Sequence, residues 1–212
     1  MGKRPSRKTF AESKKQAKNN RYNPKHHTKA RINRKITPYY FDDETVFLTF
    51  AQKNQREPPI TTMKIVIQRV SRASVTIAEK TKSTIGKGFL ILLGIATDDT
   101  TDDVEWLVKK IVGLRIFDDE NGVMNLSIRD VDGDIMVVSQ FTLMAGYKKG
   151  NRPSWIKAAP HHISIPLYNA FCTMLGEALG KPVSTGEFGA DMQVELVNSG
   201  PVTICMDTRN KE

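Results

Sequence analysis

The sequence lacks most of the side chains that metalloproteins and disulfide-bonded proteins depend on. Its 212 residues include two cysteines, Cys172 and Cys205, and neither belongs to a CxxC or a Cys/His cluster. We therefore expect neither a structural zinc site nor a disulfide framework, and this cysteine usage is typical of a reducing cytoplasm. No apolar run approaches the roughly twenty residues that span a bilayer, and no apolar signal core lies near the N-terminus. The sequence predicts a cytoplasmic protein with no membrane segment.

Common catalytic motifs are absent as well. There is no glycine-rich nucleotide-binding loop, no HExxH and no GxSxG. His161 and His162 are adjacent, so their side chains point to different faces, and we interpret them as a solvated loop pair just before a helix. The acidic stretches 118–120 and 130–134 precede or surround glycines, which is typical of hairpin turns rather than of a calcium site. We expect no bound metal and no cofactor.

Positive charge is confined to the N-terminal part of the chain. Residues 1–62 hold 15 Lys/Arg and 5 Asp/Glu, whereas the remainder is almost neutral. Residues 1–36 have too few apolar side chains to form a core, so we expect disorder there. Three interpretations stay open: an arm that neutralises RNA phosphates, a targeting presequence, or a stretch upstream of a true start at Met63. We predict a basic extension over 1–62 and one domain over 63–212.

The pattern after Met63 predicts an α+β domain. The run 89–96 is too apolar for a half-exposed strand, so we expect it at the centre of the sheet. One helix should begin near Thr100-Thr101, and a second after Ser164, with Pro166 in its opening turn. Strands are expected at 64–70, 73–78, 88–96, 134–142, 191–198 and 201–207. This order predicts a mixed or antiparallel sheet, as a sandwich or partial barrel, with two main helices packed on one side.

One candidate functional motif is Ser139-Gln140-Phe141-Thr142, at the end of an expected strand. Strand alternation would put Ser139 and Phe141 on one face and Gln140 and Thr142 on the other. Thr142 as a nucleophile would need an adjacent base, and no histidine follows or precedes it closely. From the residues alone, an ordinary strand end with two hydroxyl groups is the simpler interpretation.

The second motif, Asn198-Ser199-Gly200-Pro201, lies between two expected strands. A Gly-Pro pair is unusual there, because proline cannot donate to a strand ladder and glycine weakens a strand interior. The bond before proline is held cis at little cost, and a cis bond turns the carbonyl groups on both sides of it in one direction. The motif would then hold rigid main-chain acceptors in a pocket.

The motifs and their order resemble the D-aminoacyl-tRNA deacylases, also called D-tyrosyl-tRNA deacylases. The resemblance runs from Met63 to about Asp207 and includes 68–75, 114–117, 124–127, 139–143, 149–154, 188–192 and 198–203. It implies hydrolysis of the ester between a D-amino acid and the 3′-terminal adenosine of tRNA, with rejection of L-aminoacyl-tRNA and removal of glycine from mischarged tRNA. It also implies a homodimer with active sites at the subunit interface and no metal.

By this resemblance, Ser139, Gln140, Phe141 and Thr142 line the catalytic pocket, where backbone N–H groups bind the developing oxyanion. Gly200-Pro201 would reach into the partner's site as a cis element whose carbonyl groups exclude L side chains. Met192 would pack under the adenosine, Arg69 would support the Gly-Pro loop, and Asn198 would bind or support substrate. Either Thr142 or the tRNA 2′-hydroxyl would drive catalysis, and the lack of a partner base favours the second. The alternative function is a noncatalytic RNA- or ribosome-binding protein that acts through the basic arm.

Overall fold

The computed structural model describes residues 62–148 and 150–211. The predicted extension, including the basic stretch 1–36, lies outside these residues except for Thr62, so its role and the domain boundary remain predictions. Within the described residues, no helix is both long and apolar enough to cross a membrane.

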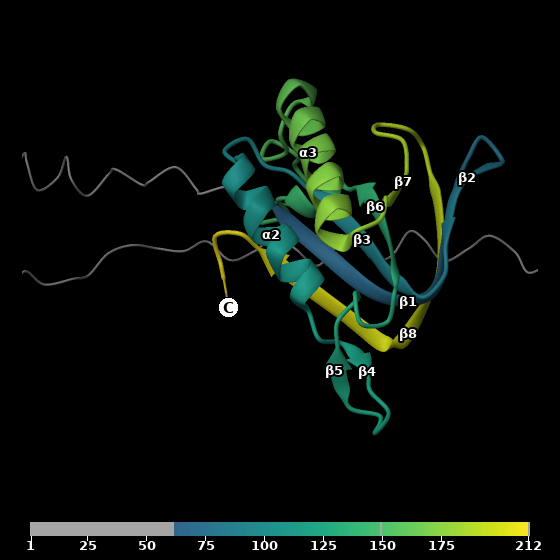
Figure 1. Ribbon diagram of the computed structural model, residues 1–212. Coiled ribbons are helices and arrows are strands. Elements are labelled where there is room, and N and C mark those ends of the chain that lie inside the picture. Colours follow the sequence, from purple (N-terminus) through teal and green to yellow (C-terminus); the bar gives the residue numbers. More distant parts are fainter. Residues whose placement is uncertain (1–61, 149, 212) are drawn as a thin grey trace, which may run out of the picture. The chain divides into compact units, whose positions relative to one another are not determined.

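A strongly curved, mixed β-sheet forms the body of the domain (Figure 1). Its strands are β1 (Lys64–Ile77), β2 (Lys80–Ile85), β3 (Gly88–Gly94), β6 (Asp134–Ser139), β7 (Ser184–Thr185) and β8 (Gln193–Asp207). They are arranged in the order β2-β1-β3-β6-β7, and β8 pairs with the free edge of β1. The β3–β6 and β6–β7 pairs are parallel, and the others are antiparallel. The sheet is therefore a nearly closed barrel, which confirms the predicted α+β class.

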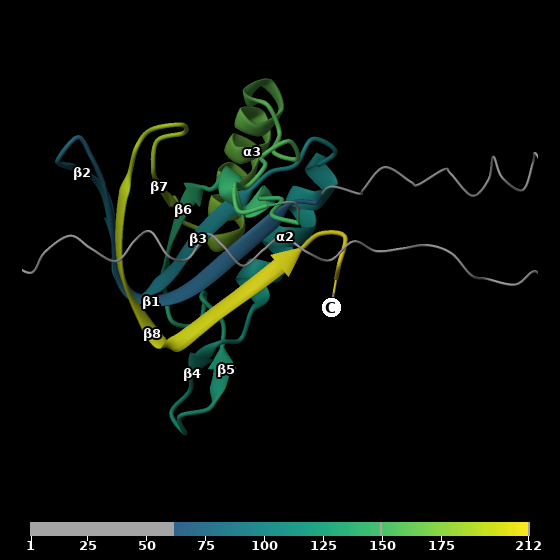
Figure 2. The ribbon, with the colours of Figure 1, turned by 180° about the vertical axis from the view of Figure 1, so that it is seen from behind.

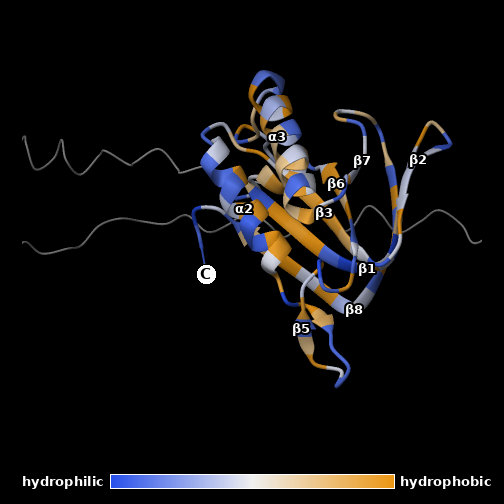
Figure 3. Cartoon of the chain, viewed as in Figure 1, coloured by the Kyte–Doolittle hydropathy of each residue, from blue (hydrophilic) through white to orange (hydrophobic). Residues whose placement is uncertain are grey.

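Two helices cover one face of this sheet, α2 (Thr101–Gly113) and α3 (His161–Leu179) (Figure 1). The main core lies between them and the strands, and Phe89, Ile91 and Leu93 of β3 belong to it. The intervening Leu90 belongs to a second core inside the curve of the sheet. Both faces of β3 are thus buried, which explains its continuous apolar run and confirms its predicted central place. Figure 3 shows the same concentration of hydrophobic residues on the middle strands.

The start of α2 agrees with its sequence pattern. Thr100 is the N-cap residue, and its N–H and hydroxyl both donate to Asp103 Oδ2, at 2.9 and 3.3 Å. Acidic side chains at this end also interact favourably with the helix dipole.

The start of α3 was predicted wrongly. The helix begins at His161 rather than after Ser164, with Pro160 as its N-cap residue. The carbonyl group of Pro160 accepts the Ile163 and Ser164 N–H groups and also the Ser164 hydroxyl. The two histidines therefore lie in the first turn of the helix, and Pro166 lies inside the helix.

Two pairs of predicted strands are continuous in the structure. The ranges 64–70 and 73–78 merge into β1, and 191–198 and 201–207 merge into β8, which follows β1 along its length (Figure 2). The break in the pattern is a bulge, because Gln68 pairs with Thr203 and Val70 pairs with Asn198. The four residues 199–202 therefore project from the strand without ladder partners on β1.

The predicted strand 134–142 is too long. β6 ends at Ser139, and residues Phe141–Met144 form a short 3-10 helix, η1. The reason lies in the neighbouring strand, because β3 ends at Gly94 and offers no further backbone partner. The expected alternation of faces thus does not extend to Phe141 and Thr142.

One of the two predicted hairpin turns is confirmed. Residues 119–123 connect β4 (Phe117–Asp118) to β5 (Met124–Leu126), and Asp119 Oδ1 accepts the Asn121 and Val123 N–H groups. The turn at 129–133 is not a hairpin, because it joins β5 to β6, which belong to different sheets.

Candidate active site

A cavity of about 600 Å³ lies where the carboxyl ends of β3 and β6 meet the first turn of α3. Ligands of α/β proteins commonly bind at the carboxyl ends of parallel strands. Strand ends, the segment before α3 and the segment before β8 all contribute to its wall. The lining residues are Leu93, Ile95, Val138, Ser139, Gln140, Phe141, Ala158, Ala159, Pro160, His161, Ser164, Phe188, Gly189, Ala190, Asp191, Met192 and Val194.

The end of β6 brings the first motif to this cavity. The Gln140 N–H donates to the Leu93 carbonyl oxygen at 2.7 Å, and the chain then turns into η1. The first N–H groups of such a helix have no acceptor within the helix. Among residues 62–148 and 150–211, nothing accepts the N–H of Phe141 or Thr142. Phe141 thus brings one open backbone donor to the cavity, and a second belongs to the adjacent Thr142, just beyond the lining residues. Two adjacent donors of this kind can bind an anionic oxygen.

A glycine allows this close arrangement. A β-carbon on Gly94 would lie 2.8 Å from the Met144 side chain, 2.9 Å from that of Leu143 and 3.0 Å from the Gln140 carbonyl oxygen. Any larger residue at the end of β3 would push η1 away and displace the two open N–H groups.

Thr142 differs from the other three residues of its motif. Ser139, Gln140 and Phe141 line the cavity, whereas Thr142 does not. Its hydroxyl oxygen accepts a hydrogen bond from Gln140 Nε2. No hydrogen bond joins that hydroxyl to a histidine or a carboxylate within the described part of the chain. A nucleophilic hydroxyl needs such a base.

Phe141 forms an exposed aromatic edge of the cavity. Its side chain is 57% exposed, and its ring meets that of Trp155 edge-on at 5.4 Å. Trp155 follows the turn closed by Gly146 and Ser154, which exchange backbone hydrogen bonds. This turn carries the exposed cations Lys148 and Arg152.

Met192 lines the opposite wall from the segment before β8. Its sulfur accepts the Glu187 N–H at 3.5 Å. A β-carbon on Gly186 would lie 2.5 Å from the same sulfur, so only glycine permits this packing. The Met192 side chain thus forms an apolar part of the cavity wall, against which a flat nucleoside base could pack.

His161 is a lining residue that the sequence analysis missed. It was interpreted as part of a solvated loop pair, but the first turn of α3 places it in the cavity wall. Its ring packs edge-on against Phe188 at 5.7 Å, and Phe188 packs in turn against Tyr168 at 5.6 Å. The Tyr168 hydroxyl donates to the Val137 carbonyl oxygen at 2.9 Å, and burial raises the pKa of Tyr168 well above its usual value. The second histidine, His162, is exposed and does not line the cavity.

The second motif forms a separate cluster around Arg69, a side chain that is almost fully buried. Its Nε donates to the Ser199 carbonyl oxygen at 3.1 Å, and its Nη1 donates to the Ile116 carbonyl oxygen at 2.7 Å and to Asp118 Oδ1 at 3.2 Å. The guanidinium group therefore joins the bulge of β8 to the β4–β5 hairpin.

The Asn198 side chain connects the two ends of the bulge. Its Oδ1 accepts the Val202 N–H at 3.0 Å, and its Nδ2 donates to Thr203 Oγ1 at 3.1 Å. Between these contacts the Gly200-Pro201 bond is cis, as the sequence analysis predicted. Gly200 has a φ of 120°, and both residues are exposed.

The two motifs lie at opposite ends of the sheet within one chain. Ser139 pairs with Leu93, and Leu93 pairs with Ile65 of β1. The β1 partner of Asn198 is Val70, five positions further along, which corresponds to about 17 Å at about 3.3 Å per residue. Accordingly, none of Arg69, Asn198, Gly200 and Pro201 lines the cavity. The structure brings together three of the four residues of the first motif with Met192, and leaves the second motif apart.

The described residues contain no group of three or more His, Cys, Asp or Glu side chains able to hold a metal ion. The cavity lining instead offers open backbone N–H groups, the polar side chains of Ser139, Gln140, His161 and Asp191, and an apolar wall that suits a planar ring. The fold and the cavity together define an α+β protein with open backbone donors at a cavity edge, an arrangement found in enzymes that act on acyl groups.

Comparison with known proteins specifies the family. Residues 66–207 match the family model described as D-Tyr-tRNA(Tyr) deacylase. D-aminoacyl-tRNA deacylases of Phocaeicola vulgatus and Bacteroides thetaiotaomicron are 67% and 66% identical over 150 residues, which are 71% of this chain and the whole of each relative. A solved structure of a c-Myc DNA unwinding element binding protein is 43% identical, with a TM-score of 0.65, over 68% of this chain and 97% of that one. The chain belongs to the D-aminoacyl-tRNA deacylase family.

Proposed function

We propose that this chain is a D-aminoacyl-tRNA deacylase, a hydrolase that cleaves the ester between a D-amino acid and tRNA. The observation that carries this conclusion is the match to relatives of that activity over their whole length. The cavity supports it, because two open N–H groups lie beside an apolar wall large enough for the terminal nucleoside.

The reaction follows from these groups. The ester carbonyl oxygen would point at the N–H groups of Phe141 and Thr142, which stabilise its negative charge once water has added to the carbonyl carbon. The bond from that carbon to the ribose oxygen then breaks. The ribose oxygen takes a proton, and the amino acid leaves as a carboxylate.

The proton acceptor is best assigned to the substrate. Among the described residues Thr142 has no hydrogen-bonded base, and its hydroxyl already accepts from Gln140. We therefore assign activation of water to the 2′-hydroxyl of the terminal adenosine rather than to Thr142. The apolar side chain of Met192 would lie under the adenine ring.

We further propose that the chain acts as a homodimer in which each Gly200-Pro201 loop enters the cavity of the partner. Two features support this: the loop is exposed, and it lies far along the sheet from the cavity of its own chain. Main-chain carbonyl groups of the loop would occupy the space that an L side chain needs. A glycyl ester has no side chain to exclude, so we expect glycine to be removed from mischarged tRNA as well. As a proofreading enzyme for translation, the protein would act in the cytoplasm.

The decisive experiment compares deacylation of D-Tyr-tRNA, L-Tyr-tRNA and Gly-tRNA under the same conditions. We expect rapid hydrolysis of the D-tyrosyl and glycyl esters and at least a 100-fold slower reaction of the L-tyrosyl ester. Equal rates for D- and L-Tyr-tRNA would refute chiral selection, and no hydrolysis of any of the three would refute the enzymatic function.

A further inference from the structure

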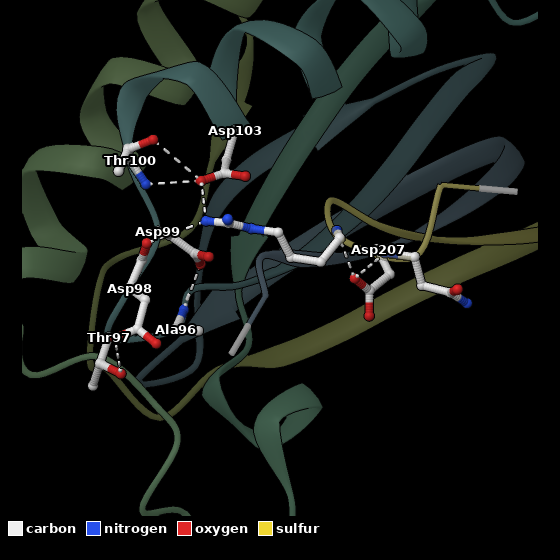
Figure 4. Close-up of polar contacts among 9 residues, drawn as sticks. Ala96, Thr97, Asp98, Asp99, Thr100, Asp103 and Asp207 are labelled. Atoms are coloured by element: carbon white, nitrogen blue, oxygen red, sulfur yellow. Dashed lines mark hydrogen bonds and ion pairs between the residues drawn. The ribbon is translucent and has the colours of Figure 1, made fainter. Parts of the chain in front are cut away.

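A buried carboxylate with an incomplete set of partners lies at the entrance to α2. Asp99 is only 7% exposed. Its Oδ2 accepts the Ala96 N–H at 2.6 Å, as Figure 4 shows, whereas its Oδ1 has no hydrogen-bond partner in the described part of the chain. Leaving an ionised oxygen buried and unpaired is expensive. The structure must therefore either keep this carboxyl protonated or hold a donor against it.

The groups that face Asp99 leave it without a counter-charge. Burial is the main reason that its pKa is raised to about 6, and the Asp103 carboxylate raises it further. Arg209, the cation that acts on Asp99, donates instead to Asp103 Oδ2 and to the Asp98 carbonyl oxygen, both at 3.3 Å. Its charge therefore acts on Asp99 only without direct contact. The backbone N–H groups of Ala96 and Met63 also lower the pKa of Asp99.

Met63 is the residue that faces this carboxylate from the beginning of the domain. It is fully buried, and its carbonyl oxygen accepts the Thr208 N–H at 3.1 Å. Its own N–H lies close enough to lower the pKa of Asp99. The Thr208 hydroxyl, on a residue 1% exposed, is the other buried side-chain polar atom without a partner within the described residues. The backbone of Met63 thus contacts both residues that carry an unpaired oxygen, Thr208 through its carbonyl group and Asp99 through its N–H.

The nitrogen of Met63 is an amide in this chain, but it is the α-amino nitrogen in a chain that begins there. The stretch from Met63 to Glu212 is 150 residues long, which equals the full length of the matched relatives. An α-ammonium at this position would add one positive charge and three hydrogen-bond donors in place of one. A full positive charge and extra donors are what the Asp99 and Thr208 oxygens lack.

We propose that Asp99 and Thr208 form a buried binding site for a primary ammonium group, and that its occupant is the α-ammonium of a chain beginning at Met63. The site would then favour a chain that begins at Met63, because any residue attached before Met63 turns its charged α-ammonium into a neutral amide. This gives a physical reason to assign the functional chain to residues 63–212.

The test compares three starts: the full chain, a chain from Met63, and a chain from Thr62, which moves the ammonium one residue away. The second chain has the full length of the matched relatives. Each is made with and without Asp99→Asn, and thermal unfolding is measured at pH 7. In the Met63 chain we expect Asp99→Asn to lower the Tm by about 3–6 °C, since it breaks a buried ion pair. In the other two chains we expect it to raise the Tm, because it removes an unpaired charge.

The exposed Asp102, in the first turn of the same helix, supplies the control. Asp102→Asn makes the same change of charge and should shift the Tm of all three chains alike. A direct readout is the pKa of the Met63 α-ammonium, followed by NMR on methionine-labelled protein. It should lie at least one unit above the ordinary value of about 7.7–8.0 and return to it in Asp99→Asn.

A shift of the same sign in all three chains, or an ordinary ammonium pKa, would overturn the proposal and leave a buried water as the partner of Asp99. Failure of the Met63 chain to fold would overturn it as well. Asp99 does not line the cavity, so hydrolysis of D-Tyr-tRNA should be unchanged in every folded variant. The outcome is therefore independent of the proposed enzymatic function.

Discussion

The guanidinium group of Arg69 lies against Gly200, so closely that a β-carbon on this glycine would be 2.9 Å from Nη2. The same β-carbon would lie 2.8 Å from the Val202 side chain. The buried side chain of Arg69 on β1 thus packs against the exposed Gly-Pro loop of β8 and holds it in place. Any change on either side of this contact should move the loop while leaving the distant cavity of the same chain intact.

Gly200→Ala should therefore damage chiral selection with little effect on the rest of the domain. The added methyl group clashes with Arg69, and a φ of 120° is strained for any L residue. We expect kcat/KM for D-Tyr-tRNA to fall about 10-fold or more, and the D-to-L rate ratio to decrease. Gly122→Ala is the matched control, since Gly122 also has a positive φ, of 75°, but has open space around it. Unchanged selectivity in Gly200→Ala would contradict the proposed gate.

Arg69→Ala should destabilise the protein and reduce its activity together. The change leaves two carbonyl oxygens without their donor and Asp118 without its cation. We expect a loss of about 2–4 kcal/mol in the free energy of unfolding. Denaturant unfolding measures this, and D-Tyr-tRNA hydrolysis is assayed well below the unfolding midpoint. Arg72→Ala removes an exposed arginine of the same strand and should have a small effect on both. Equal effects of the two substitutions would show that the buried contacts do not support the loop.

Much of the fold could be predicted from the sequence because it depends on local patterns. The uninterrupted apolar residues of β3 require burial on both faces, and only a central strand provides it. The N-terminus of α2 is marked by Thr100 and Asp103, which bond to each other within one turn. Both signals lie within a few residues of the structure that they specify.

The rest depends on contacts between distant segments. The end of β6 is set by the end of β3, about forty-five residues earlier, so the sequence around Phe141 still has the pattern of a strand. His161 joins the cavity because Phe188 packs on its ring, and nothing near either residue in the sequence indicates this contact. Arg69 was expected beside the Gly-Pro loop only by family resemblance, since 130 positions separate it from Ser199.

Thr142→Ala separates the two possible routes of catalysis. The Thr142 hydroxyl accepts from Gln140 but is hydrogen-bonded to no base in the part of the chain that the structure describes. We therefore expect the variant to retain at least about a tenth of the wild-type kcat on D-Tyr-tRNA. Replacing the 2′-hydroxyl of the terminal adenosine by hydrogen should instead nearly abolish hydrolysis by the wild-type enzyme. Near-total loss of activity in a Thr142→Ala protein with an unchanged Tm would restore the threonine as nucleophile.

The stability of the full chain should depend on pH through Asp99. Its pKa is raised from 3.8 to about 6 in the folded protein, mainly by burial. Since the folded state keeps this proton more tightly than the unfolded state, the contribution of Asp99 to stability is lost as pH rises from about 4 to about 6. The loss is about 3 kcal/mol at most, because one pKa unit corresponds to about 1.4 kcal/mol. Asp119, Asp130 and Asp207 have lowered pKa values, and their ionisation acts in the opposite direction.

The difference between the full chain and its Asp99→Asn variant isolates the effect, because the other carboxylates are common to both proteins. Denaturant unfolding at pH 4, 5, 6 and 7 should show the variant gaining stability relative to the parent over this range, with little further change above pH 7. A chain from Met63 should instead show almost no change above about pH 5, since a carboxylate paired with an ammonium has a lowered pKa and is already ionised there. If the difference does not change with pH in the full chain, another group holds the Asp99 carboxylate ionised and Asp99 does not lack a partner.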